Sequence, residues 1–416
     1  MQIQRPRYLN QLIARKNNGM IKIVSGLRRC GKSYLLSVLF ADYLRTQGVP
    51  DDHIISMHLD EFADEKFRDP QVCHDFVMAR IQDDQPYYLM IDEVQLMDKF
   101  VSVLNGFLRV SNLDVYVTGS NSKFLSSDIV TEFRGRGDEI CVYPLSFSEF
   151  YSAVSGDWRD AWRQYYTFGG MPQVLSYVRD EDKVKYLRNL LKETYLKDII
   201  DRNHIKNSDE LEELLSVIAS NIGGLTNPQK LSDTFNSVKH LGISAPTVKQ
   251  YLDYFMDSFI VSRAMRYDIK GRKYISTPSK YYFVDVGLRN AQLNFRQQEE
   301  SHIMENILYN ELNIRGYSVD VGVVRASQKL GPNQYTKTLL EVDFVANMGN
   351  KRYYIQSALN IDSAEKAAQE ERSLLGIQDS FQKFIVVRDD IMPSRNENGT
   401  VIIGIKDFLL NPSSLD

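Results

Sequence analysis

Eight consecutive residues near the N-terminus have the types and spacing of a phosphate-binding loop of the form G-x-x-x-x-G-K-S. The two glycines let the backbone curl so that its N–H groups face a phosphate. The lysine reaches the β- and γ-phosphates, and the following serine hydroxyl is a ligand for Mg²⁺. We therefore predict a nucleoside triphosphate site, with ATP and Mg²⁺ as cofactors, formed by Gly26, Leu27, Arg28, Arg29, Cys30, Gly31, Lys32, Ser33 and Tyr34.

The residues on both sides of this loop supply the structural context that the motif needs. The apolar run 21–24 predicts a buried strand, and residues 34–44 carry apolar side chains at helical spacing. A strand, a glycine-rich turn and a helix in this order place the loop at the carboxyl edge of a parallel sheet.

A second strand candidate, residues 87–91, ends in two neighbouring carboxylates, Asp92 and Glu93. We expect Asp92 to hold Mg²⁺ through water beside Ser33, and Glu93 to polarise the water that attacks the γ-phosphate. Another strand candidate, residues 53–59, separates this strand from the loop in sequence. The strand before Asp92 is therefore not the next one after the loop, an arrangement typical of ATPases with an added catalytic glutamate.

The strand candidate 114–118 is followed by small polar residues, at the end where a parallel sheet presents its ligand. Thr118, Ser120 or Asn121 would be positioned there to sense the γ-phosphate, and we favour Ser120 and Asn121. A helix N-cap at Ser120 or Ser122 is an equally good interpretation and is compatible with sensing.

Two arginines flank a glycine just before the strand candidate 139–143. Arg134 or Arg136 would supply an arginine finger to the γ-phosphate of a neighbouring subunit, which would require a homo-oligomer. A solvated turn is the competing interpretation, and the sequence does not separate the two arginines.

Six segments of the chain match the motifs of one family, and they run from the loop to the middle of the sequence: residues 26–33, 89–95 (LMIDEVQ), 118–122 (TGSNS), 134–136 (RGR), 144–150 (PLSFSEF) and 169–172 (GGMP). Together they resemble a widespread prokaryotic family of predicted AAA+-like P-loop ATPases with a C-terminal domain of uncharacterised function. The resemblance extends over nearly the whole chain. It implies an α/β P-loop core of the AAA+/ASCE type, a winged helix and a restriction-nuclease-like fold, more than it implies a biological role.

Composition limits the class of protein. The 416 residues are 43% hydrophobic and 25% charged with a formal net charge of −4, so any nucleic-acid binding must use a local basic surface. The three cysteines are scattered without metal-ligand spacing, which favours a reducing, cytoplasmic location. No stretch approaches 18 uninterrupted apolar residues, so we expect no membrane span.

The middle of the chain predicts a helical lid followed by a winged helix. Residues 146–205 have helical periodicity interrupted at the Gly-Gly-Met-Pro segment, and residues 206–290 read as short helices followed by a hairpin. The hairpin is basic, as expected of a wing that tracks DNA phosphates. Asp253 and Asp257 weaken the case for a recognition helix, so DNA and protein both stay open as partners. The basic residues are Arg263, Arg266, Lys270, Arg272, Lys273 and Lys280.

The order of elements after residue 297 resembles the PD-(D/E)xK nuclease core. Asp343 fits its first acid, but the second acid and the lysine fall on Gln356 and Ala358. Glutamine is a poor Mg²⁺ ligand and alanine cannot orient a water, so we predict a scaffold without cleavage activity. A weakly bound cation at Glu305 and Asp343 stays open.

The expected organisation is therefore an ATPase core at 1–145, a lid at 146–205, a winged helix at 206–290 and a nuclease-like domain at 298–416. The predicted function is an ATP-driven switch or motor coupled to a nucleic-acid- or protein-binding module. An ATP-gated interaction protein and an ATP-regulated nuclease are the alternatives.

Overall fold

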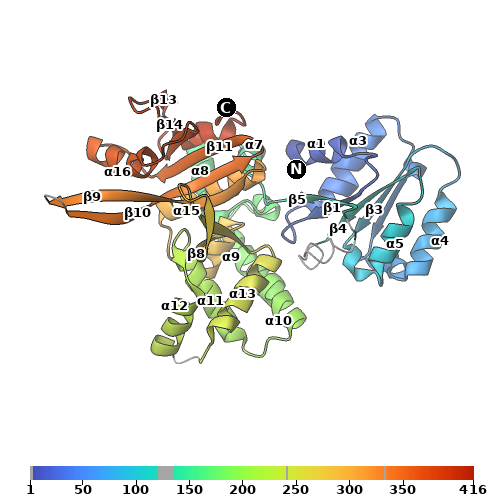
Figure 1. Ribbon diagram of the computed structural model, residues 1–416. Helices are drawn as coiled ribbons and strands as arrows, with labels where there is room; N and C mark the ends of the chain where they lie inside the picture. Colours follow the sequence, from blue (N-terminus) through green and yellow to red (C-terminus); the bar gives the residue numbers. More distant parts are fainter. Residues whose placement is uncertain (1–2, 120–132, 134, 240–241, 332–333) are drawn as a thin grey trace. The chain divides into compact units, whose positions relative to one another are not determined.

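The computed structural model describes residues 3–119, 133, 135–239, 242–331 and 334–416 (Figure 1). The chain divides into two compact units. The first unit is Met1–Pro144 with Asp257–Phe259, and the second is Leu145–Met256 with Ile260–Asp416. Among the described residues, no helix has the length and apolar character that crossing a membrane requires.

The first unit is built on a five-stranded parallel sheet with the strand order β2-β3-β4-β1-β5. The three central strands are buried along their whole length, as expected of a parallel sheet that is covered on both faces. The strands are β1 (Ile21–Ser25), β2 (Ile54–His58), β3 (Tyr87–Asp92), β4 (Leu113–Thr118) and β5 (Gly137–Cys141).

The strand β2 confirms that a further strand lies between the loop and the strand ending at Asp92 along the chain, and within the sheet β1 and β3 are not neighbours either. β4 lies between β1 and β3, and β2, the candidate at 53–59, pairs with the far side of β3. All five strands are parallel, so their carboxyl ends, including Ser25, Asp92 and Thr118, lie at one edge.

Helical segments cover this sheet (Figure 1). α2, η1 and α3 follow one another with right-handed helical dihedrals at each junction, so they form one continuous helix after the loop. The α4 helix begins at an Asp69 N-cap, whose side chain accepts N–H bonds from residues 71 and 72. The segments are α1 (Pro6–Ala14), α2 (Lys32–Tyr34), η1 (Leu35–Phe40), α3 (Ala41–Thr46), η2 (Asp51–His53), η3 (Phe62–Arg68), α4 (Pro70–Arg80), η4 (Val94–Leu96) and α5 (Phe100–Phe107).

The second unit begins with the helices predicted as a lid. A capping box between Ser146 and Glu149 starts α7, and Asp157 caps α8. These helices pack with later parts of the second unit, since α8 and α9 contact α14 and α7 contacts α17. The elements are α7 (Phe147–Ala153), α8 (Trp158–Phe168), η6 (Pro172–Ser176), α9 (Asp180–Asn189), η7 (Leu190–Leu196) and α10 (Lys197–Asn203).

The Gly169-Gly170 break has a packing cause. A Cβ on Gly170 would lie 2.2 Å from the Leu145 carbonyl oxygen, and one on Gly169 would lie 2.2 Å from a carboxylate oxygen of Asp285. That carboxylate accepts the Gly170 N–H at 2.7 Å and caps α14 through the Leu288 N–H at 3.0 Å. The two glycines thus let α8 approach the start of α14 closely.

The predicted winged-helix segment contains three helices, a short strand and a hairpin. The winged helix itself stays a prediction, although the order of elements is the expected one. The elements are α11 (Ser208–Ser220), β6 (Leu225–Thr226), α12 (Pro228–Thr234), η8 (Phe235–Lys239), α13 (Ala245–Asp257), β7 (Val261–Asp268) and β8 (Lys273–Phe283).

The hairpin and the C-terminal region share one nine-stranded sheet with the order β13-β14-β12-β11-β10-β9-β7-β8-β6. β7 pairs in parallel with β9 over residues 266–268 and 321–323, so backbone hydrogen bonds cross the expected boundary at 290–298. The proposed domain limits stay a prediction. The remaining elements are α14 (Val286–Gln292), α15 (Glu300–Ile314), β9 (Ser318–Gly331), β10 (Gln334–Met348), β11 (Lys351–Ala358), α16 (Ala364–Leu375), β12 (Gln382–Val387), β13 (Ser394–Arg395), β14 (Val401–Gly404) and α17 (Ile405–Leu410).

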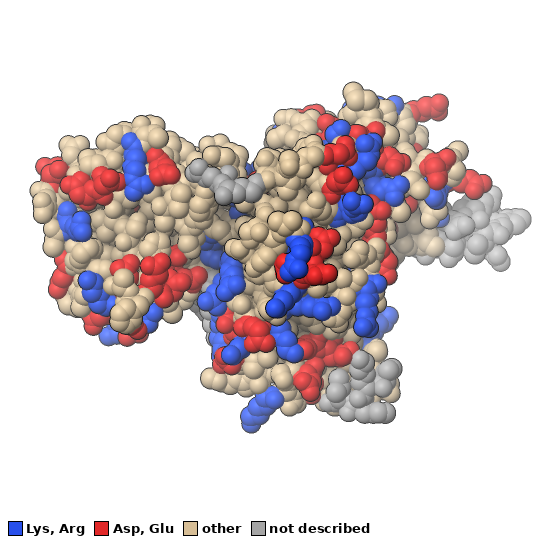
Figure 2. All heavy atoms as spheres, turned by 180° about the vertical axis from the view of Figure 1, so that it is seen from behind, with Lys and Arg blue, Asp and Glu red and all other residues tan. Residues whose placement is uncertain are grey.

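Two long helices cover opposite faces of this sheet. Phe344 on β10 contacts the Tyr309 ring of α15, whereas the next residue, Val345, belongs to a core cluster with Leu374 of α16. Successive side chains of a strand point to opposite faces, so α15 and α16 lie on different sides. On the face seen in Figure 2, basic and acidic side chains are interspersed and neither sign covers the surface.

Candidate active site

The loop after β1 requires glycine at its first position. Gly26 has a φ of 127°, and a Cβ there would lie 2.1 Å from the Val142 carbonyl oxygen. Gly31, with a φ of 100°, occupies the N-cap of α2 in the left-handed region. Any side chain at position 26 would therefore push the loop away from β5, and a residue with a Cβ at position 31 would be strained.

The Lys32 ammonium group lies over the middle of this loop. It donates hydrogen bonds to the carbonyl oxygens of Gly26 at 3.0 Å and Leu27 at 3.1 Å, and the residue is buried. Arg28, Arg29 and the neighbouring Ser33 are exposed. The loop thus presents one preorganised cation at its centre, with further cationic side chains at its rim.

Arg5 supports the loop from behind, and sequence reasoning missed it. Its guanidinium group donates to the Cys30 carbonyl oxygen at 2.9 Å and to the Tyr143 carbonyl oxygen at 2.8 Å. The residue is 3% exposed and stacks over the Tyr8 ring. The sequence signal is weak, because Arg5 precedes a Pro at a helix start and lies 21 residues before the loop.

Asp92 lies at the carboxyl end of β3, buried beside the loop helix. Burial on its own would raise the pKa of this carboxyl group, but the neighbouring polar groups of His58, Thr118 and Ser33 outweigh burial and lower the pKa. Ser33 and Asp92 are thus brought together as the sequence predicted. An ionised carboxylate and a hydroxyl at one point are suitable oxygen ligands for Mg²⁺.

His58 is a second site residue that sequence reasoning missed. It ends β2 in register with Asp92, and its Nδ1 lies 3.7 Å from an Asp92 carboxylate oxygen. The neighbouring Asp92 carboxylate outweighs burial and raises the pKa of His58. The available signal was the polar end of the strand candidate 53–59, since parallel strands end at a common edge.

Glu93 follows Asp92 in a left-handed backbone conformation, with φ of 50° and ψ of 48°. The Thr118 hydroxyl links the two acids, because it donates to Asp92 and accepts the Glu93 N–H at 3.0 Å. Gln95 donates its side-chain amide to the Glu93 carboxylate. Thr118 therefore contacts both acidic residues, through the side chain of Asp92 and the backbone of Glu93.

The favoured sensor residues Ser120 and Asn121 and the finger candidate Arg134 lie outside the described residues. Arg136 is exposed and precedes β5, where its carbonyl oxygen accepts the Ile21 N–H. This places it at the amino ends of β1 and β5, one strand length of roughly 16 Å from the loop edge. An action of Arg136 on the nucleotide of its own chain is therefore excluded, and an action on a neighbouring copy stays a prediction.

The residues at this edge fit a magnesium nucleotide. Gly26 leaves a space that a Cβ would fill, Lys32 supplies a cation at the loop carbonyls, and Ser33 with Asp92 supplies oxygen ligands. Glu93 lies next to this donor set, with its N–H bonded to Thr118 and its carboxylate to Gln95. The arrangement can bind a nucleoside triphosphate and orient a water at its terminal phosphate.

A second cluster of charged side chains lies in the C-terminal sheet, and it shows that the prediction of Lys280 as a DNA-binding residue was wrong. Lys280 is 2% exposed, so it cannot follow DNA phosphates as expected of a wing residue. Its ammonium group lies 2.9 Å from a Glu305 oxygen, 2.7 Å from a Glu341 oxygen and 3.9 Å from an Asp343 oxygen. These charges outweigh the effect of burial and raise the pKa of Lys280.

The nuclease-like acids therefore surround an internal cation. Burial and then the charge of Glu305 raise the pKa of Asp343 to about 8, and Asp343 accepts the Ser357 N–H at 2.8 Å. Gln356 and Ala358 lie on the neighbouring strand β11, as predicted, and Phe344 pairs with Ile355. Among the described residues, no group of three His, Cys, Asp or Glu side chains could hold a metal ion.

Comparisons with known proteins identify two regions. Residues 18–151 match the family described as AAA domain, and residues 159–299 match a domain of unknown function, DUF8612. An uncharacterized protein of Haemophilus influenzae is 33% identical over 98% of both chains. An uncharacterized protein of Methanocaldococcus jannaschii is 26% identical over 81% of this chain and 77% of its own.

Among solved structures, the Orc1 protein of Aeropyrum pernix in complex with DNA is 11% identical to this chain. The likeness covers 71% of this chain and 93% of that one with a TM-score of 0.31. A TM-score this low has no bearing on partners or activity.

Proposed function

We propose that this chain hydrolyses ATP with Mg²⁺. The chain belongs to a family of AAA+-like P-loop ATPases with a C-terminal domain of unknown function. The observation that carries the proposal is the meeting of Lys32, Ser33 and Asp92 at one sheet edge, with Glu93 adjacent. In the described residues this is the one site where a phosphate-binding loop and a pair of adjacent carboxylates come together.

The residues divide the work by their positions. Bound Mg²⁺ would neutralise charge on the β- and γ-phosphates. Lys32 binds phosphate oxygens from the loop, and Ser33 and Asp92 provide the oxygen ligands. Glu93 accepts a proton from the attacking water, while Thr118 holds the backbone of Glu93 and the side chain of Asp92 in a fixed relation.

Two substitutions separate binding from hydrolysis. Lys32→Ala should abolish ATP binding measured by calorimetry, because it removes the loop cation. Glu93→Gln should bind ATP as well as wild type and lose at least about 100-fold in turnover, since the general base is gone. Glu65→Gln is the matched control, because it removes only an exposed ion pair with Arg68. Normal turnover in Glu93→Gln would overturn the assignment.

We further propose that ATP turnover acts as a switch or motor on the second unit, which binds nucleic acid or protein. Support comes from the exposed hairpin side chains of Arg263, Lys270, Arg272 and Lys273, while Arg266 is half-buried. The test is ATP hydrolysis with and without DNA, with the molecular mass measured by light scattering. DNA-stimulated turnover in an oligomer supports a motor. If Arg136 acts on a neighbouring subunit, Arg136→Ala alone should slow turnover, and mixing it with Glu93→Gln subunits, which keep Arg136, should restore part of that turnover.

An ATP-gated interaction protein is the alternative if DNA has no effect on turnover. It predicts capture of a protein partner that depends on the bound nucleotide and needs no nucleic acid. An ATP-regulated nuclease has less support, because Gln356 and Ala358 replace two catalytic groups and Lys280 lies among the remaining acids.

A further inference from the structure

A cavity of about 570 Å³ opens where the turn between β7 and β8 meets the C-terminal sheet. Its lining comes from three places: the hairpin turn, the strands β9 and β11, and the segment after α16. A volume in this range accommodates a small organic ligand. The residues used below are Tyr267, Lys270, Arg272, Arg325, Arg352 and Phe381.

The lining is strongly cationic although the protein as a whole is acidic. Four of the lining side chains are basic, and Asp379 is the one carboxylate among the described lining residues. Both Asp379 oxygens are engaged, since one accepts the Tyr354 hydroxyl at 2.5 Å and the other the Phe381 N–H at 3.2 Å. In the described part of the chain, Lys270 and Arg272 have no carboxylate within ion-pair distance.

The hairpin turn that carries Lys270 and Arg272 is held in place. Asp268 accepts the Gly271 N–H at 2.8 Å and pairs with Arg325 at 3.0 Å. The Ile269 N–H bonds to the Val323 carbonyl oxygen at 3.1 Å, and the Ile269 side chain belongs to the core beneath α16. The backbone that carries the two cations is therefore held against the C-terminal sheet.

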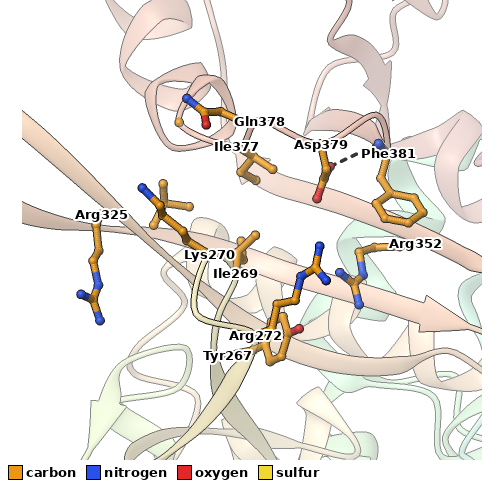
Figure 3. A pocket seen from close by; sticks show the side chains of 12 residues that line it. Tyr267, Ile269, Lys270, Arg272, Arg325, Arg352, Ile377, Gln378, Asp379 and Phe381 are labelled. Carbon is orange, nitrogen blue, oxygen red and sulfur yellow. Dashed lines mark hydrogen bonds between the residues drawn. The ribbon is translucent and has the colours of Figure 1, made fainter.

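One side of the cavity is flat and aromatic. The Arg352 guanidinium group lies 5.7 Å from the centre of the Tyr267 ring and 5.3 Å from that of Phe381. In Figure 3, Arg272 and Arg352 lie together beside Tyr267, Phe381 lies beyond Arg352, and Arg325 lies on the opposite side past Ile269. Phe381 is 38% exposed, so a ligand in the cavity can reach its ring.

From this geometry we propose that the cavity binds a nucleoside phosphate, either as a free nucleotide or as the 5′-terminal nucleotide of a single strand. Lys270 and Arg272 bind the phosphate, because their hairpin turn is held in place and neither side chain is already paired with a carboxylate in the described part of the chain. The base stacks on the Tyr267, Arg352 and Phe381 planes, since aromatic rings and guanidinium groups are the usual platforms for an unpaired base.

This site is separate from the ATPase site and does not depend on it. It also differs from a wing that follows a duplex, because such a wing would use every exposed cation of the hairpin equally. Lys273 provides the distinction: it is exposed on the same hairpin, one residue after Arg272, and does not line the cavity.

The test uses full-length protein carrying Lys32→Ala, so that the loop does not contribute. AMP binding is measured by calorimetry. A decathymidylate with a 5′-phosphate and a 3′-fluorescein is followed by anisotropy, beside the same strand with a 5′-hydroxyl. Arg272→Glu should weaken binding at least about tenfold, and Phe381→Ala at least about fivefold. Lys273→Glu should change it less than about twofold.

AMP binding without a preference for the phosphorylated strand identifies the free nucleotide as the ligand. A preference of at least about tenfold for the 5′-phosphorylated strand, displaced by AMP, identifies the strand end. Binding of neither probe overturns the proposal. Equal losses in Arg272→Glu and Lys273→Glu overturn it too, and so does inorganic phosphate that competes as well as AMP. The side chains of Arg272, Phe381 and Lys273 are all exposed, and unchanged melting temperatures establish that the three variants are folded.

Discussion

Replacing Lys280 by methionine tests whether the nuclease-like centre is filled by an internal cation. Methionine keeps the unbranched shape of the side chain, one heavy atom shorter, and removes its charge. The carboxylates of Glu305 and Glu341 then lose the ammonium group that lies within 3 Å of both, at 2.9 and 2.7 Å. Lys280 is 2% exposed, so bulk solvent does not supply the missing positive charge.

The magnitude follows from the burial of the partners. Removing one member of a buried ion pair costs roughly 3–5 kcal/mol, because the other charge stays in a poorly solvated place. The Glu305 side chain is 12% exposed and contributes most of this cost, whereas Glu341 at 34% is screened by solvent. For a unit of this size the loss corresponds to a fall in the melting temperature of roughly 6–20 °C.

The assay is thermal unfolding without nucleotide, with and without millimolar Mg²⁺ or Mn²⁺. Lys280→Met should melt lower than wild type and be stabilised by either ion, which then neutralises the exposed carboxylates. Wild type should not respond. Lys249→Met is the control, since Lys249 is an exposed lysine of α13. Adding Glu305→Gln to Lys280→Met should recover at least about 1 kcal/mol.

Two results would refute this reasoning. A melting temperature of Lys280→Met equal to that of wild type would mean that the ammonium group does not compensate the carboxylates. Stabilisation of wild type by Mg²⁺ without nucleotide, lost in Asp343→Asn, would mean that the centre binds metal despite the lysine. DNA cleavage dependent on Mg²⁺ and abolished by the same variant would support the nuclease alternative.

Two further predictions concern single side chains. Asp343 has a pKa raised to about 8 by burial and by Glu305, against an ordinary value of 3.8, so the fold favours its protonated form. That contribution to stability is complete below about pH 4 and is lost as the pH rises towards 8. Between pH 5 and pH 7, the free energy of unfolding in urea should fall for wild type relative to Asp343→Asn, by at most about 1.4 kcal/mol per pH unit. The same pH dependence in both proteins would contradict this prediction. Arg5→Met removes two charge-assisted hydrogen bonds that join the loop carbonyl of Cys30 to the carbonyl of Tyr143, so ATP affinity measured by calorimetry should fall about tenfold. The control Arg7→Met should bind normally, and equal affinities in both variants would show that Arg5 does not brace the loop.

The sequence was sufficient for the nucleotide-binding unit because its signals are local. Eight adjacent residues specify the loop, and each buried strand is a continuous apolar run that ends in the residues of interest. The common edge of a parallel sheet then brings Ser33 and Asp92 together without further information. Arg5 and His58 escaped because a single polar residue carries no periodicity, and its partner is set by tertiary packing.

The second unit was harder to predict because its contacts join distant segments. The hairpin was expected to be a free wing, yet β7 pairs with β9 more than fifty residues later. Basic side chains that look equivalent in sequence are then separated by the pleat of the strand and by this pairing. Lys270 faces a cavity and Lys280 is buried among acids, although both lie in one hairpin.

The two acidic centres of the protein show why residue types alone do not assign chemistry. Asp92 and Asp343 are both buried, and each lies beside hydrogen-bond donors and a basic side chain, which is His58 for Asp92 and Lys280 for Asp343. At Asp92 the neighbours are a histidine, a threonine and a serine, whose hydrogen bonds lower the pKa of the carboxyl group and keep it a charged ligand. At Asp343 burial and a second acid raise the pKa, and Lys280 already compensates the remaining charge. A divalent cation is therefore attracted by the charged carboxylate of Asp92, but beside Asp343 it must displace the ammonium group of Lys280. For this reason we propose that ATP is hydrolysed at the loop edge and that the C-terminal sheet binds a ligand without cleaving it.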